Sequence, residues 1–242
     1  MRLSREQIKK RILIIGLLGF LIVSFFFITP AIQKKQLGFR SSQLKQDTTI
    51  VGNMTSTTFV DNNGEIATAA DVGYATKIVI KTKDGEFEEY LDDEGKRVCR
   101  HSGYYGIYRE YDQVGNNVRL TYVNLDNNPI IITQGYAIEE REYDDEKRIV
   151  SVSYYDEKEK PVLTSFGYGK SYEYNDDGQI IRITYLDENG KPMIIKAGYA
   201  SVVLNYYTTE DQNIGKTESE FYLNEWGEPI KLSLGQYGVH KE

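Results

Sequence analysis

Few residues in this sequence have the types and spacing that catalysis or metal binding requires. The chain contains two histidines, His101 and His240, and a single cysteine, Cys99. Two histidines outside an HExxH pattern do not make a three-histidine zinc site, and one cysteine makes neither an intrachain disulfide nor a cysteine-rich zinc site. A Ser-His-Asp triad would lack any local signature such as a nucleophile elbow. We therefore expect a non-enzymatic protein with no catalytic residue, no metal and no cofactor, in which His101 is structural or exposed.

The acidic segments are the remaining candidates for a metal site, because calcium prefers oxygen ligands in short loops. Segments such as 175–178 (Asn-Asp-Asp-Gly) and 187–190 (Asp-Glu-Asn-Gly) lack the alternating carboxylates and the distal Glu of an EF-hand. A glycosidase would need one distinctive pair of carboxylates, but acidic residues recur throughout the sequence. Asp, Asn and Gly are also the residues that tight turns select, so these segments are interpreted as turns.

Tyrosine offers a different chemistry, since the chain has 20 Tyr but only 9 Phe and 1 Trp. A flat ring with a polar edge can stack on a sugar or anchor a protein partner. Gly-Tyr pairs begin at residues 73, 103, 135, 167 and 198, at spacings of 30, 32, 32 and 31 residues. We take four of these tyrosines as candidate ligand-binding residues: Tyr104, Tyr136, Tyr168 and Tyr199. The alternative is that they fill the two faces of a thin sheet.

The elements that would position these tyrosines follow the same period. Two series of turns alternate along the chain, one closed by prolines such as Pro161 and Pro192, the other lying halfway between them. The segments between turns, for example 148–155 and 179–186, are rich in Ile, Val, Thr and Tyr, as is typical of strands. The sequence thus predicts an all-β fold: an extended or curved antiparallel β-meander of about five two-strand repeats with a period of about 31 residues.

The recurring Tyr-Asp-x-x-Gly pattern resembles the YD repeats of RHS-type bacterial surface and toxin-shell proteins. It occurs as residues 111–115 (Tyr-Asp-Gln-Val-Gly), and in related form as residues 174–178 and 186–190. The resemblance covers residues 59–242 and implies a long, curved antiparallel sheet at a cell surface. This chain differs in having two non-identical turns per period and too few repeats to wind a closed shell, and no catalytic residue is carried over.

Charge is distributed unevenly and argues against nucleic acid as a partner. Residues 1–46 hold nine Lys or Arg and one acidic residue, which leaves 20 basic and 35 acidic residues at 47–242, a net charge of −15. Such a field repels phosphates and anionic lipid headgroups.

Residues 12–29 form an uncharged apolar run of 18 residues, about 27 Å long as a helix, which is close to the thickness of a bilayer core. A buried core helix would need a β-rich protein around it, and a cleaved signal peptide would need a small-x-small site that is not seen after the run. Five basic residues before the run and three soon after it place the N-terminus inside. We expect a cytoplasmic tail at 1–11, a single transmembrane signal anchor at 12–29, a linker at 30–57 and an extracytoplasmic β-repeat domain at 58–242.

These features together predict a non-catalytic module at the cell membrane, used for adhesion, cell-wall association or protein contact. Its expected partners are the membrane itself and either a cell-wall polysaccharide or another surface protein. The alternative is a carbohydrate-binding module of an envelope enzyme, or a fragment of a longer surface protein.

Overall fold

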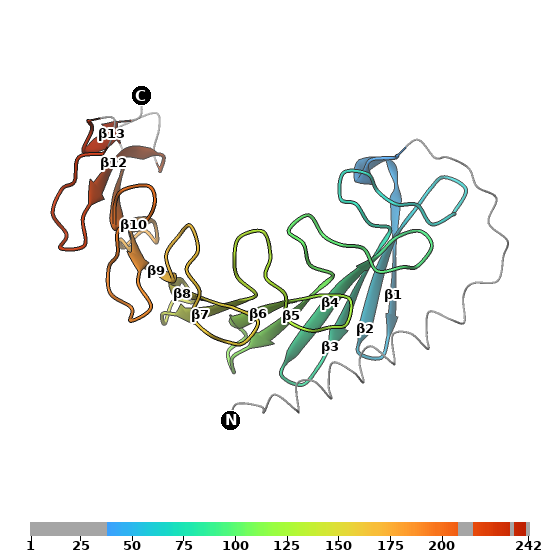
Figure 1. Ribbon diagram of the computed structural model, residues 1–242. Helices are drawn as coiled ribbons and strands as arrows, with labels where there is room; N and C mark the ends of the chain where they lie inside the picture. Colours follow the sequence, from blue (N-terminus) through green and yellow to red (C-terminus); the bar gives the residue numbers. More distant parts are fainter. Residues whose placement is uncertain (1–37, 208–214, 233–234, 241–242) are drawn as a thin grey trace. The chain divides into compact units, whose positions relative to one another are not determined.

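The computed structural model describes residues 38–207, 215–232 and 235–240 (Figure 1). The predicted cytoplasmic tail at 1–11, the predicted anchor at 12–29 and the start of the predicted linker lie outside these ranges. Within them, no helix has the length and apolar character needed to span a membrane. The helical structure found there is one short 3-10 helix, η1 (Ser41–Gln43).

The remainder of the described chain is built from thirteen strands, and their order in the sheet is their order in the sequence. The paired strands run antiparallel, for example β1 with β2 and β12 with β13. The predicted all-β antiparallel meander is therefore confirmed. The strands are β1 (Lys45–Val51), β2 (Met54–Val60), β3 (Thr76–Lys81), β4 (Gly85–Leu91), β5 (Gly106–Tyr111), β6 (Asn117–Val123), β7 (Ile138–Tyr143), β8 (Ile149–Tyr155), β9 (Gly169–Tyr174), β10 (Ile180–Leu186), β11 (Ser201–Tyr206), β12 (Thr217–Leu223) and β13 (Gly238–His240).

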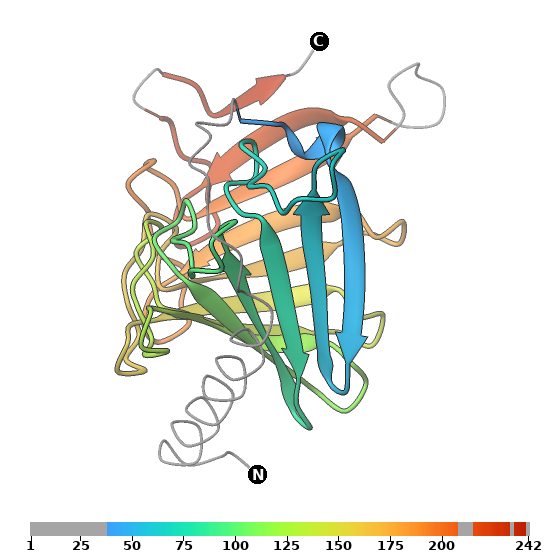
Figure 2. The ribbon, with the colours of Figure 1, turned by 90° about the vertical axis from the view of Figure 1, so that its right-hand side faces the viewer.

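The chain divides into two compact units, which we describe separately. Of the described residues, the first unit contains 38–110 and 121–130, and the second contains 111–120, 131–207, 215–232 and 235–240. In the first unit β1 to β4 pair in sequence, and Figure 2 shows them side by side in blue to green. In the second unit β7 to β13 pair in the same consecutive way.

One five-residue turn recurs throughout both units. In the turn at 187–191, the Asp187 N–H donates to the Lys191 carbonyl at 2.8 Å, and the Asp187 carboxylate accepts the N–H groups of Asn189 and Lys191. The fourth residue, Gly190, has a φ of 76°, a conformation that glycine adopts without steric cost. The same closing N–H to carbonyl bond is found at 61–65, 92–96, 112–116, 124–128, 144–148, 156–160, 175–179, 187–191 and 224–228. Members of both predicted turn series therefore share one geometry. The turn between β3 and β4 differs, because there the Thr82 N–H donates to the Gly85 carbonyl at 2.7 Å.

The connection from each even-numbered strand to the next odd-numbered strand, which we call an arm, contains a further turn. In the arm between β10 and β11, the Ile195 N–H donates to the Tyr199 carbonyl at 3.0 Å, and Gly198 has a φ of 93°. Ahead of this turn, Pro192 forms an isolated bridge with Leu186, so the arm folds back beside β10. Each Gly-Tyr pair therefore belongs to a turn of its own, and each repeat has three turns where the sequence predicted two. Residues 208–214, which connect β11 to β12, lie outside the described ranges.

The β-structure begins earlier than the sequence indicated. Residues 45–57, expected to be part of the linker, form β1 and most of β2, joined by a two-residue connection at Gly52 and Asn53. The physical reason is local: strand-forming residues, mainly Thr with Ile, Val and Phe, lie on the two sides of the Gly52-Asn53 pair, and this pattern favours a hairpin although no Gly-Tyr pair is present.

Buried side chains lie on both faces of the sheet rather than on one. In β4, Phe87 and Tyr90 point to opposite faces, yet their exposed fractions are only 4% and 8%. Phe87 packs with Tyr108 and Val123, while Ile78, Ile80 and Leu91 form a second cluster. Because both faces carry buried side chains, a ligand could contact the sheet only at the side chains that remain exposed.

Candidate functional site

The four candidate tyrosines occupy equivalent places, where an arm ends and an odd-numbered strand begins. Tyr104 belongs to the first unit, and Tyr136, Tyr168 and Tyr199 belong to the second. All four are half-buried. These tyrosines are thus neither fully exposed nor fully buried in the core.

Three of the four rings pack against an aromatic ring from a neighbouring even-numbered strand. The ring of Tyr199 lies 4.7 Å from that of Tyr222 and 5.8 Å from that of Tyr185, measured between centroids. The ring of Tyr136 lies 4.6 Å from that of Tyr154, and the ring of Tyr104 lies 5.1 Å from that of Tyr122. Tyr168 is held through its backbone: its N–H donates to the Leu186 carbonyl at 2.8 Å, and its carbonyl accepts from the Tyr154 N–H at 2.9 Å.

Three of the four partner tyrosines are buried, and the fourth, Tyr122, is half-buried. Tyr154, Tyr185 and Tyr222 are 5%, 8% and 7% exposed. Sequence reasoning missed them, although a signal was present: each precedes the last residue of its strand, and this position is aromatic in β2, β4, β6, β8, β10 and β12. The rings of Tyr104, Tyr136 and Tyr199 therefore form aromatic pairs with residues of the even-numbered strands, and we call these pairs the ladder of each unit.

Carboxylates accept hydrogen bonds from several ladder hydroxyls. The Tyr136 hydroxyl donates to Glu139 Oε2 at 2.9 Å, and the Tyr222 hydroxyl donates to Glu220 Oε1 at 2.6 Å. Glu139 is only 9% exposed and forms a 2.6 Å ion pair with Arg141, so its charge is compensated. These carboxylates are occupied as acceptors in a packed face.

Burial keeps the phenols of Tyr154, Tyr185 and Tyr222 protonated. Burial, with a smaller contribution from the hydrogen bond to Glu220, raises the pKa of Tyr222 to about 12. Burial likewise raises the pKa of Tyr154 and of Tyr185 well above the ordinary value. A phenol with a raised pKa is neutral near neutral pH, which suits packing and hydrogen bonding rather than proton abstraction.

The remaining candidates for chemistry lie apart from the ladder. His101 is exposed in the arm that precedes β5, and Cys99 is exposed in the same arm. His240 is exposed in β13. In the described part of the chain, no cluster of three or more His, Cys, Asp or Glu residues could hold a metal ion.

Exposed aliphatic side chains on the arms form a second candidate surface in the second unit. Ile131, Leu163 and Ile194 are 41%, 55% and 41% exposed, and each is the second residue after the arm's proline. Adjacent arms are in contact, since the Ile131 N–H donates to the carboxylate of Glu157 at 3.4 Å. Phe166, 42% exposed, adds an aromatic ring on the arm of Leu163. We call these four side chains the arm row.

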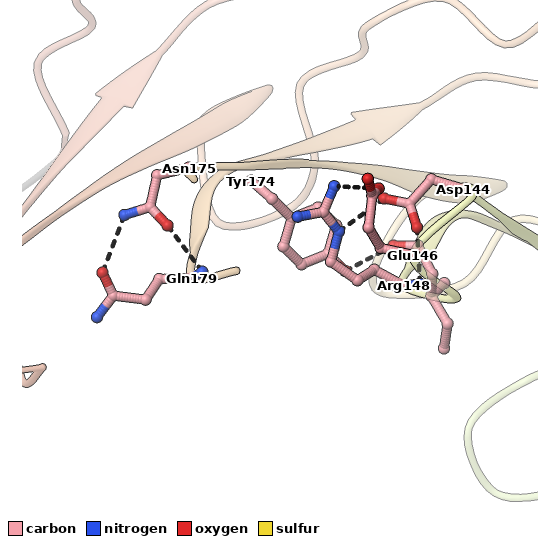
Figure 3. A network of polar contacts seen from close by, with 7 residues as sticks. Asp144, Glu146, Arg148, Tyr174, Asn175 and Gln179 are labelled. Carbon is pink, nitrogen blue, oxygen red and sulfur yellow. Dashed lines mark hydrogen bonds and ion pairs between the residues drawn. The ribbon is translucent and has the colours of Figure 1, made fainter. Parts of the chain in front are cut away.

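The opposite ends of the strands, at the hairpin turns, carry polar networks that join successive hairpins (Figure 3). The Arg148 guanidinium pairs with Asp144 at 2.7 Å and Glu146 at 3.0 Å, and lies 4.8 Å from the centre of the Tyr174 ring. In the next turn, Asn175 donates to the Gln179 side chain. Because these groups bond to one another, the network holds neighbouring hairpins together.

Comparison with known proteins provides no relative for this chain: no protein-family model matches it, and no curated protein matches it.

Proposed function

We propose that this chain is a non-catalytic, membrane-anchored contact module whose β-repeats lie outside the cytoplasm and bind another surface protein through the arm row. The observation that carries the proposal is the recurrence of exposed aliphatic side chains at one position on three successive arms. Isolated exposed apolar residues are common, but exposed apolar residues that recur at one position of successive repeats are typical of an interaction surface.

The geometry of the arm row suits a partner with an extended apolar surface. Equivalent residues of adjacent arms are two strands apart, which is about 10 Å at the usual strand spacing. Pro161 and Pro192 stand exposed two residues before Leu163 and Ile194, so they widen the apolar strip. Proline and branched aliphatic side chains lose little conformational entropy when a partner covers them.

The anchor and the charge support the membrane part of the proposal. The uncharged run at 12–29, with five basic residues before it, is typical of a signal anchor with its N-terminus inside. The net charge of −15 at residues 47–242 disfavours nucleic acid and anionic lipid as ligands of the repeats.

Carbohydrate binding is the second candidate, and the half-buried state of Tyr136, Tyr168 and Tyr199 favours it. A ring that is partly accessible can still stack on a sugar. However, packing against Tyr154 and Tyr222 occupies part of the surface of Tyr136 and Tyr199. We therefore place protein contact first and cell-wall polysaccharide second.

An adhesion assay separates the two candidates. Cells that display the full chain are tested for binding to bacterial envelope material, before and after protease treatment of that material. We expect binding to be lost after protease treatment and to fall roughly tenfold or more in the triple variant Ile131→Ser, Leu163→Ser, Ile194→Ser. Val114→Ser is the matched control, because Val114 is 63% exposed but lies at a hairpin turn.

The opposite pattern would support the carbohydrate alternative. Binding that survives protease treatment and the triple variant, but is lost with Tyr136→Ala and Tyr199→Ala in a chain that remains folded, would contradict protein contact through the arm row.

A further inference from the structure

The first strand, β1, lies at one edge of the sheet. In the strand order it has β2 on one side and no other described strand on the opposite side. All seven of its residues are exposed, including Ile50 at 71% and Val51 at 51%. A sheet edge of this kind presents unpaired backbone donors and acceptors to any strand that approaches it.

The outward-facing backbone groups of β1 can be identified from the pairing of β2. The Phe59 N–H donates to Ala75 at 2.8 Å, toward β3. Successive residues of a strand direct their N–H groups to alternate sides, so Ser56 and Thr58 face β1. Their partners Thr49 and Asp47 therefore face β2. The residues of β1 whose N–H and carbonyl groups face away from the sheet are Gln46, Thr48 and Ile50.

The strand that already pairs with β1 resembles β1 itself. β1 reads Lys-Gln-Asp-Thr-Thr-Ile-Val and β2 reads Met-Thr-Ser-Thr-Thr-Phe-Val, so both end in Thr-Thr, an apolar residue and Val. They pair antiparallel, first residue to seventh, from Lys45 opposite Val60 to Val51 opposite Met54, without a register shift. A strand with the sequence of β1 is thus a close match to the partner that β1 accepts within the chain.

The edge lacks the features that usually prevent pairing between sheets. β1 contains no proline, and its register with β2 has no bulge. Its two charges, Lys45 and Asp47, lie at one end. In an antiparallel pair of two β1 strands centred on Thr48, Lys45 faces Val51 and Asp47 faces Thr49 of the other copy, so no like charges are opposed.

From these observations we propose that two copies of the chain associate edge to edge through β1, with the two Thr48 residues facing each other on a twofold axis. Thr48, Gln46 and Ile50 then exchange backbone hydrogen bonds with Thr48, Ile50 and Gln46 of the second copy. The arrangement is isologous, since each copy contributes the same surface, and it closes at two subunits.

The mass of the full chain in a mild detergent, measured by light scattering coupled to size exclusion, tests the proposal. We expect two chains per particle for the native sequence and for Thr48→Val, which retains the strand. Thr48→Lys should give one chain per particle, because it places two like-charged ammonium groups opposite each other at the twofold axis. Thr48 is exposed within its own chain, so the lysine should not disturb the fold. An unchanged melting temperature verifies that this variant is folded. One chain per particle for the native sequence, or two for Thr48→Lys, would overturn the proposal.

Disulfide trapping tests the register independently. In a Cys99→Ser background, Thr48→Cys should form a disulfide-linked dimer under mild oxidation, because facing hydrogen-bonded residues have Cα atoms about 5.5 Å apart, within the range of a disulfide. Lys83→Cys, an exposed site in the turn between β3 and β4, is the matched control and should remain unlinked. Equal trapping at both positions would contradict the β1 interface.

Discussion

The phenolic hydroxyl of Tyr174 donates a 2.7 Å hydrogen bond to the backbone carbonyl of Ile149, which joins the end of β9 to the start of β8 (Figure 3). Tyr206 makes the same bond to Ile180 at 2.7 Å, and Tyr143 makes it to Asn117 at 2.8 Å. In each case the last residue of an odd-numbered strand reaches the first residue of the even-numbered strand before it. In Tyr143-Asp144, therefore, the tyrosine binds the previous hairpin while the aspartate closes its own turn.

Removing this hydroxyl should weaken the link between hairpins. Tyr174→Phe is expected to lower the free energy of unfolding by about 1 kcal/mol, the usual net value of one hydrogen bond. Tyr174→Ala should cost more, because the contact between Arg148 and the ring is lost as well. Chemical denaturation measures both effects. Tyr237→Phe is the control, because the Tyr237 side chain is 53% exposed, and it should change the free energy of unfolding little. Equal losses of stability in Tyr174→Phe and Tyr237→Phe would contradict a role for the Tyr174 hydroxyl in linking hairpins.

The stability lost on replacing a turn glycine should depend on the shape of the new side chain. Gly178 has a φ of 76°, and a β-branched residue tolerates this conformation poorly, so Gly178→Val is expected to destabilise the chain by about 1–3 kcal/mol. Gly178→Lys is the matched control, because Lys147 occupies the same turn position with a φ of 63°. We expect the lysine variant to lose clearly less stability in thermal denaturation. Equal melting temperatures for the valine variant and the native chain would contradict the turn assignment.

The turns could be predicted from sequence because their causes are local. The Asp or Asn acceptor at the first position and the positive φ at the fourth involve five consecutive residues, and residue type is sufficient to indicate both. The second turn of each arm was not predicted, because the Gly-Tyr pair served as a marker of the period and its glycine was not interpreted as a turn residue. The bond from Tyr174 to Ile149 spans 25 residues, and only the pairing of strands brings the two together.

Acid should destabilise the array through the turn aspartates. The Lys160 N–H, assisted by that of Lys158, holds the pKa of Asp156 below its ordinary value of 3.8, and the Lys191 N–H does the same for Asp187. A depressed folded pKa means that the stabilisation is complete above the ordinary pKa and is lost as pH falls through the folded value. Melting temperatures should therefore drop below about pH 4.

Asparagine substitutions at Asp156 and Asp187 test whether protonation of these two carboxylates, rather than of other groups, causes the loss of stability in acid. Asp156→Asn with Asp187→Asn keeps the acceptor oxygens but cannot be protonated there, and Asn124, Asn175 and Asn224 already occupy this position in other turns. The double variant should show a shallower fall in melting temperature between about pH 5 and pH 3. An identical fall in both proteins would exclude the turn carboxylates as the cause.

Ring packing in the ladder means that removing a candidate tyrosine should lower the stability of the chain. Tyr199 contacts the rings of Tyr185 and Tyr222, so Tyr199→Ala should cost about 3 kcal/mol, the lower end for deletion of a buried aromatic residue. Tyr199→Phe retains both ring contacts and should lose much less. Denaturant unfolding of the two variants provides the comparison. A loss for the alanine variant well below 1 kcal/mol would mean that the ring serves binding rather than packing.

The candidate site was only partly accessible to sequence reasoning. The period located Tyr104, Tyr136, Tyr168 and Tyr199 at equivalent positions, but their half-burial depends on Tyr154, Tyr185 and Tyr222 from other strands. Likewise Ile131, Leu163 and Ile194 are typical core residues by composition, and their exposure follows from the way each arm folds back beside its strand.

The location of the repeats tests the proposed function most directly, and Cys99 makes the measurement simple. It is the only cysteine in the sequence and is exposed in the first unit. Intact cells are treated with a membrane-impermeant maleimide, and the chain is then recovered from the membrane fraction, with Cys99→Ser as the unlabelled control. If the repeats lie outside the cytoplasm, Cys99 is labelled without permeabilisation, on a chain that still carries its N-terminal residues. Labelling only after the cells are permeabilised would place the repeats inside the cytoplasm and contradict the proposed location.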